Sequence, residues 1–233
     1  MRSPLSPLSP FLLVFALFTG DAAFAQQSAG SSSHKANSVS LLYGSNFTQI
    51  EVWDSNIIRV IHRIKGAPPE AKSFAVIGHP VATNSTVSHS GTLTTLLTPD
   101  LRVELDKSTG SVRFLDKSGN VILAEAPGST QLTATTAGGA PTYATRQCFN
   151  LDPTEAIYGL GQHRDGFMNY VGNSVHLQQQ NMEVAIPVLL SSKGYAVLWD
   201  NPAITDVDAG KSDKSLLTWS SEAGSGVDYY FMY

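Results

Sequence analysis

Cysteine is almost missing from this chain, because Cys148 is the only one among its 233 residues. A single thiol cannot form an intramolecular disulfide, so the fold must rest on packing. The six histidines include no pair at the spacing of helical metal ligands, so we expect neither a metal site nor a bound cofactor. Charged residues are also few, at 15%, and the net charge is −4. Without a basic cluster, the chain is not expected to bind nucleic acid.

Long hydrophobic runs are missing too. The apolar segment from Phe11 to Phe18 is much shorter than the roughly 20 residues that span a bilayer. Because Arg2 precedes it and small residues at Ala23 and Ala25 follow it, this segment predicts a secretory signal peptide over residues 1–25. We therefore expect a secreted or periplasmic protein without a membrane anchor. Residues 26–37 are polar and predict a disordered leader, which leaves residues 38–233 as one domain.

Helical patterns are not found either, and apolar residues instead recur with a period of two, as in Ile50–Trp53 and Ile57–Ile61. The clearest stretch runs from Leu101 to Leu123, LRVELDKSTGSVRFLDKSGNVIL, where two clusters of turn residues separate three alternating segments. This stretch predicts a β-meander. Its LDKS motif occurs only twice, which is too few copies for a solenoid. The periodicity predicts one all-β domain, either a sandwich or a barrel.

The second half of the chain contains further strand patterns. Val184–Leu190 and Tyr195–Trp199 flank a tight turn, so we expect them to pair as a hairpin. Pro187 has no N–H to donate and should lie at a strand start, an edge or a bulge. Val227–Tyr233 reads as an apolar and aromatic strand with no turn or tail after it. We therefore expect the chain to be truncated.

Signatures of catalysis are weak. The glycines of Gly159–Gly161 lack the third glycine of a dinucleotide fingerprint, since position 164 is Arg164, and they favour a tight strand exit instead. Asp206 and Asp208 can share one face of a strand and could hold Ca²⁺ or act as acid and base. Turn-forming, solvated carboxylates are the favoured interpretation. A G-x-S-x-G motif is also missing, so we assign no catalytic residue to this chain.

Several aromatic residues could stack on sugar rings, or they could fill the core. They are Trp53, Tyr170, Tyr195, Trp199 and Trp219. Each lies in a strand-like run, where large aromatic side chains usually pack inward, so the core interpretation is favoured for Trp199 in particular.

Two stretches, YGLGQ at Tyr158–Gln162 and the segment Ile186–Asn201, resemble the N-terminal domain of glycoside hydrolase family 31, the α-glucosidases and α-xylosidases. The resemblance implies an antiparallel β-sandwich of the galactose-mutarotase-like, supersandwich type. It also implies that the catalytic carboxylates lie in a (β/α)8 barrel that follows the sandwich. The chain would then be the non-catalytic N-terminal domain of a secreted retaining α-glycosidase. Its partners would be that missing barrel and an α-linked oligosaccharide of the xyloglucan or malto-oligosaccharide type, and SSKGYAVLWDN looks most like the α-xylosidase branch.

The resemblance also points to a loop, here Asn169–Asn181, that the sandwich contributes to the substrate pocket. Many relatives carry an Asp in this loop that hydrogen-bonds the sugar, whereas this chain carries Gln178, Gln179, Gln180 and Asn181. Amide side chains both donate and accept hydrogen bonds. We therefore expect Gln180 and Asn181 to bind substrate, and the alternative is a solvated polar loop.

Two other functions remain open. The chain could be an autonomous secreted β-sandwich that binds carbohydrate, or a protein partner, without catalysis. Coding sequence beyond Tyr233 would argue against this reading. An aldose mutarotase is a third possibility, but that chemistry needs an acid and base pair on the sheet, and no residues can be assigned to it.

Overall fold

The computed structural model describes residues 31–35, 38–67 and 72–233. The predicted signal peptide and most of the predicted leader lie outside these residues. Every regular element in the described ranges is a β-strand, and all neighbouring strands pair antiparallel, which confirms the all-β, antiparallel class. In the described part of the chain, no helix has the length and apolar character to cross a membrane.

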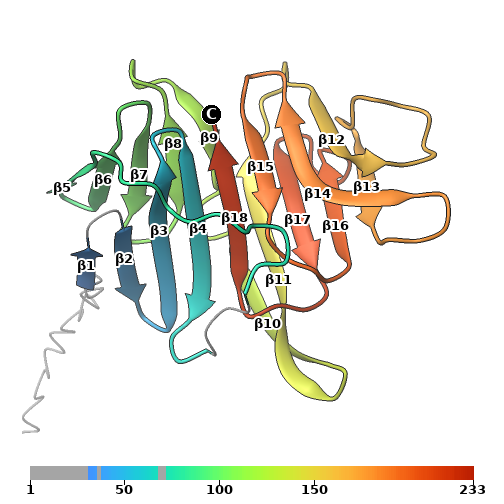
Figure 1. Ribbon diagram of the computed structural model, residues 1–233, viewed down its shortest axis with the longest axis horizontal. Helices are drawn as coiled ribbons and strands as arrows, with labels where there is room; N and C mark the ends of the chain where they lie inside the picture. Colours follow the sequence, from blue (N-terminus) through green and yellow to red (C-terminus); the bar gives the residue numbers. More distant parts are fainter. Residues whose placement is uncertain (1–30, 36–37, 68–71) are drawn as a thin grey trace, which may run out of the picture.

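The strands form one large sheet and two small ones (Figure 1). The large sheet contains, in spatial order, β1 (Ser31–Lys35), β2 (Ser38–Tyr43), β3 (Asn46–Asp54), β4 (Ile57–Ile64), β18 (Val227–Met232), β15 (Ala196–Trp199), β14 (Val184–Ser191) and β12 (Ile157–Gln162). The meander sheet contains β5 (Thr86–Ser90), β6 (Leu93–Leu97), β7 (Arg102–Asp106), β8 (Val112–Leu115) and β9 (Val121–Ala124). The distal sheet contains β10 (Gln131–Ala137), β11 (Ala140–Asn150), β17 (Leu216–Ser221), β16 (Thr205–Ala209) and β13 (Asn173–Leu177).

The two small sheets pack side by side on one face of the large sheet (Figure 1). Phe114 of the meander sheet stacks on Phe231 of β18, with ring centroids 4.0 Å apart. Trp199 of β15 stacks on Trp219 of the distal sheet at 5.4 Å. All four side chains are fully buried, and burial of such large aromatic groups contributes much of the stability of a core. The packing confirms a sandwich and confirms that Trp199 is a core residue.

The structure confirms the local patterns of the sequence. The predicted meander is β7, β8 and β9, and the predicted hairpin is β14 and β15. The predicted last strand is β18, which lies between β4 and β15 at the centre of the large sheet. Pro187 lies where the β12–β14 register shifts, at a bulge, because a proline cannot donate to a regular ladder.

The leader is the place where the structure differs from the sequence-based expectation. Within the segment that we expected to be disordered, Ser31–Lys35 forms β1 and pairs antiparallel with β2. The physical reason is that an exposed sheet edge offers unpaired backbone N–H and C=O groups, which can bind an extended segment whatever its side chains. Low apolar content alone therefore did not reveal this strand.

Candidate functional site

The YGLGQ motif forms β12, the outermost strand on one side of the large sheet. Gly159, Leu160 and Gly161 have φ angles of 93°, 63° and 100°, in the left-handed region that glycine tolerates best. A Cβ on Gly161 would lie 1.9 Å from the carbonyl oxygen of Val184, so only glycine fits there. The two glycines thus bring β12 close to the backbone of β14. Their role is structural, but they form an irregularity within the paired strand rather than the expected strand exit.

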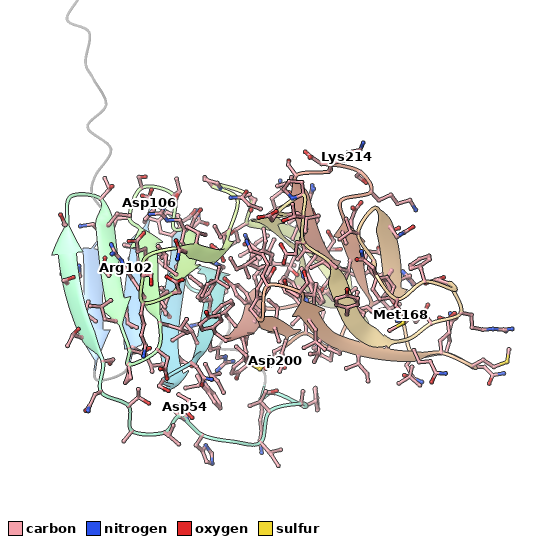
Figure 2. All side chains as sticks on the ribbon, turned by 90° about the horizontal axis from the view of Figure 1, so that it is seen from above. Asp54, Arg102, Asp106, Met168, Asp200 and Lys214 are labelled. Carbon is pink, nitrogen blue, oxygen red and sulfur yellow. The ribbon has the colours of Figure 1, made fainter. Side chains whose placement is uncertain are left out.

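Two connections beside β12 form a surface that we call the tip, residues 163–172 and 178–183. Asn169 ties the first connection to the strand, because its Oδ1 accepts hydrogen bonds from the N–H groups of Ile157 at 3.0 Å and Val171 at 3.1 Å. The N–H of Tyr170 donates to the Ile157 carbonyl at 2.8 Å. Figure 2 shows Met168 of the tip at the end of the molecule opposite Arg102 of the meander sheet.

The expected loop Asn169–Asn181 is therefore not one loop. It contains β13, which pairs with β16 in the distal sheet. The alternation in NSVHL, with Val175 and Leu177 buried and the residues between them exposed, is the sequence pattern that could have revealed this strand.

Gln180 and Asn181, the expected substrate-binding residues, lie in the tight turn that precedes β14. Gln180 and Glu183 form an isolated antiparallel bridge, and Met182 takes a φ of 68° inside the turn. The Gln180 side chain donates from Nε2 to Oε2 of Glu183 at 2.9 Å. Both Gln180 and Asn181 are exposed, so they are available to a ligand.

The sequence assigned no role to two residues of the tip, His163 and Glu183. His163 directly follows the YGLGQ motif, and its side chain is only 3% exposed. Its Nε2 lies 2.8 Å from the Leu160 carbonyl oxygen, which can only accept, so Nε2 carries a proton. Its Nδ1 lies 3.8 Å from the carboxylate of Glu183. Their proximity depends on the pairing of β12 with β14, so no pattern along the chain announces it.

The outward surface of β12 and β14 beside the tip is apolar. Its exposed side chains are Tyr158 (37%), Val184 (44%), Ile186 (46%) and Leu190 (50%). Met168 and Met182 of the tip are also exposed, at 81% and 66%. Contiguous exposed apolar residues commonly mark an interaction surface. The tip can thus offer amide groups to a neutral polar ligand beside a surface suited to protein contact.

The other polar candidates lie elsewhere. The Nδ1 of His176 and the Asp206 carboxylate lie 2.7 Å apart on the distal sheet, and this hydrogen bond raises the pKa of His176. Asp206 and Asp208 both lie in β16 and share one of its faces, so the strand interpretation is confirmed, while Asp208 also accepts hydrogen bonds from the N–H of Lys211 at 2.7 Å and from Ser212 in the turn that follows. Among the residues that the structure describes, no group of three or more His, Cys, Asp or Glu could hold a metal ion.

Three of the remaining aromatic candidates are core residues. Tyr170, Tyr195 and Trp219 are buried, with at most 5% of each exposed, and offer no ring face to a sugar. Trp53 is half-buried and packs edge-on against Tyr230 with ring centroids 5.0 Å apart.

A groove of about 610 Å³ lies away from the tip. Its lining includes Phe74, Tyr143, Pro187, Asp200 and Asp228. Asp200 accepts a hydrogen bond from Ser73 at 2.9 Å, and Asp228 accepts one from Nε of Arg59, also at 2.9 Å. Figure 2 shows Asp200 nearer the middle of the molecule than Met168. The volume is in the range of small-molecule sites.

Comparison with known proteins gives a family match. Residues 48–208 match the model of the glycosyl hydrolase 31 N-terminal galactose mutarotase-like domain. The chain is similar to the α-xylosidase of Saccharolobus solfataricus, with 28% identity over 195 residues that cover 79% of this chain and 26% of the relative. It is also similar to the isomaltosyltransferase of Sporosarcina globispora, with 25% identity over 164 residues that cover 64% and 15%. The chain thus spans about a quarter or less of the length of these relatives.

Solved structures give the same result. The α-xylosidase of family 31 from Xanthomonas citri matches with a TM-score of 0.71 and 31% identity, over 75% of this chain and 19% of that one. A soil-metagenome α-xylosidase complexed with xylose matches with a TM-score of 0.76 and 23% identity, over 87% and 32%. The dextranase of Flavobacterium johnsoniae complexed with glucose matches with a TM-score of 0.75 and 21% identity, over 87% and 26%. The last two likenesses show a shared fold.

Proposed function

Because this chain belongs to glycoside hydrolase family 31, as its N-terminal galactose mutarotase-like domain, we propose that it is the non-catalytic part of a secreted retaining α-glycosidase. The enzyme would be of the α-xylosidase or α-glucosidase type and would hydrolyse terminal α-linked sugars. Its two catalytic carboxylates, about 5 to 5.5 Å apart in retaining enzymes, would lie in a barrel outside this chain. The proposal rests on the match of residues 48–208 to the family's N-terminal domain. The alignment with a related α-xylosidase covers only 26% of that relative.

In this proposal the tip reaches the substrate pocket and the apolar surface of β12 and β14 covers the barrel. Gln180 and Asn181 would hydrogen-bond the hydroxyls of the terminal sugar. Their exposure supports this role, and so does their position beside Met182 and Val184 at the border of the apolar surface. A sugar at this border could contact both the tip and the barrel.

The proposed substrate is an α-linked oligosaccharide of the xyloglucan or malto-oligosaccharide type. Support comes from relatives, since the Flavobacterium johnsoniae dextranase has been solved with isomaltotriose and a cycloalternan-forming enzyme of Listeria monocytogenes with a pentasaccharide. The signal peptide proposed at residues 1–25 would deliver the protein to the periplasm or the medium, where such polymers are found.

The test is to incubate the purified chain with an aryl α-xyloside and an aryl α-glucoside. We expect no turnover above the rate without protein, because the chain contributes no catalytic carboxylate in this proposal. A related α-xylosidase serves as the positive control. Turnover by the chain alone would contradict the proposal.

The groove of about 610 Å³ favours a second candidate, an autonomous carbohydrate-binding module. Calorimetric titration of the chain with xyloglucan and malto-oligosaccharides separates the two functions. Saturable binding that is lost in Asp200→Ala and kept in Asn181→Ala would favour the module, because Asp200 lines the groove and Asn181 lies at the tip. Loss in Asn181→Ala alone would place the sugar at the tip.

A further inference from the structure

The orientation of the Gln180 amide follows from its partner. An ionised carboxylate only accepts hydrogen bonds, so the group that faces Oε2 of Glu183 at 2.9 Å must be the NH2 of Gln180. The amide oxygen Oε1 is the other half of the same planar group and is turned away from that carboxylate. Because the Gln180 side chain is exposed, this oxygen is presented to solvent as a hydrogen-bond acceptor.

Glu183 is itself held in place by neighbouring groups. Its backbone carbonyl accepts a hydrogen bond from Nε2 of Gln179 at 2.9 Å, and its N–H donates to the Gln180 carbonyl at 3.3 Å. Its carboxylate lies 3.8 Å from Nδ1 of His163. The Glu183 side chain as a whole is 22% exposed, so most of its surface is in contact with the protein.

His163 in turn is anchored to the YGLGQ motif. Its Nε2 donates to the carbonyl of Leu160, at 2.8 Å, and its ring packs edge-on against Tyr170 with centroids 6.5 Å apart. Leu160 is fully buried and lies between the two glycines that fit β12 against β14. His163 is thus fixed against a rigid strand, and its Nδ1 lies 3.8 Å from the Glu183 carboxylate, a distance longer than a hydrogen bond.

We propose that Glu183, held within the turn by its backbone hydrogen bonds, is a positioning residue that fixes the Gln180 amide with its oxygen outward. The tip then offers a fixed acceptor to a hydroxyl donor of a neutral sugar, without placing a charge at that point. This inference rests on the proposed function for the identity of the ligand. The locked amide itself is a property of the free chain and can be measured without substrate or barrel.

The test is the rate at which side-chain NH2 protons of ¹⁵N-labelled chain exchange with water, measured by NMR. In Glu183→Ala we expect the Gln180 NH2 to exchange about threefold faster, the scale of a partly exposed contact with a charged group. Gln179 is the internal control, because its partners are the backbone carbonyl of Glu183 and the N–H of Ala185, which the substitution keeps. Glu183→Gln retains an acceptor oxygen and should restore most of the protection.

A second variant separates the contribution of His163. Because Nδ1 of His163 lies 3.8 Å from the Glu183 carboxylate, which is longer than a hydrogen bond, His163→Ala should change the exchange at Gln180 less than Glu183→Ala does. Unchanged exchange at Gln180 in Glu183→Ala would overturn the proposal, and so would equal acceleration at Gln179, which would mean that the whole turn opens. If the Gln180 amide is fixed but Asn181→Ala and Gln180→Ala leave sugar binding unchanged, the proposed role of the tip fails while this inference stands.

Discussion

At the residue scale, the buried carboxylate of Glu125 joins the layers of the sandwich. Its Oε1 lies 2.7 Å from Nε2 of His62 on β4 and accepts a hydrogen bond from the hydroxyl of Tyr229 on β18 at 2.8 Å. Its Oε2 accepts the N–H of Val112 on β8 at 2.8 Å. Burial and the neighbouring carboxylate raise the pKa of Tyr229 well above its ordinary value, which keeps this phenol a hydrogen-bond donor.

Glu125→Ala should therefore lower the free energy of unfolding by about 3 to 5 kcal/mol, the usual cost of breaking a buried network that includes a charge. The measurement is urea denaturation followed by tryptophan fluorescence. Glu222→Ala is the matched control, because Glu222 is exposed and should change stability by less than about 0.5 kcal/mol. Equal effects of the two substitutions would show that the Glu125 network contributes little.

At the scale of elements, β12 shows how a short motif shapes an edge. Its register against β14 shifts between Gly159 and Gly161, and three successive residues have positive φ. After the shift, Gly161 and Gln162 still pair with β14, and the first connection of the tip begins at the next residue. The motif thus builds the position of the candidate site without supplying a ligand-binding side chain.

Gly161→Ala should destabilise the protein by about 2 to 5 kcal/mol, because strain at a φ of 100° adds to a clash with the Val184 carbonyl oxygen. Gly166→Ala separates the two effects. Gly166 has a φ of 79° with open space around its Cβ position, so its substitution should cost only about 1 to 2 kcal/mol. Thermal or urea unfolding gives both values, and an equal cost would exclude the clash.

At the scale of the whole molecule, the two faces of the large sheet differ. One face is covered by the meander and distal sheets, whereas the outward side of β12 and β14 leaves Ile186 and Leu190 about half exposed. In Figure 1 these two strands lie on the side of the molecule opposite β1 and β2. In the proposed enzyme the barrel would cover this surface.

The isolated chain should self-associate through this surface as its concentration rises, because apolar area is removed from water. The double substitution Ile186→Lys and Leu190→Lys should shift the protein toward the monomer in sedimentation velocity experiments. Val121→Lys is the control, since Val121 is 45% exposed but belongs to the meander sheet. A wild-type chain that stays monomeric at all concentrations would contradict this expectation.

The sequence by itself determined the strands of the meander, the β14–β15 hairpin and the core role of Trp199, and it narrowed Pro187 to a strand start, an edge or a bulge. Each depends on alternation or turn chemistry within about ten residues, and such local preferences act before any distant contact forms. Local alternation also marked β13, although the expected loop Asn169–Asn181 passed over it. The YGLGQ motif pointed to the family by resemblance, and the family match confirms it.

Only the tertiary structure decided which strands that are distant in the sequence become neighbours. It placed β18 between β4 and β15, paired β1 with the edge of β2, and brought Glu125 to His62 and Tyr229. It also brought His163 to Glu183, across strands whose pairing no local pattern specifies. The physical reason is that partner choice depends on burying whole faces and satisfying distant polar groups together, which residues acting alone along the chain do not encode.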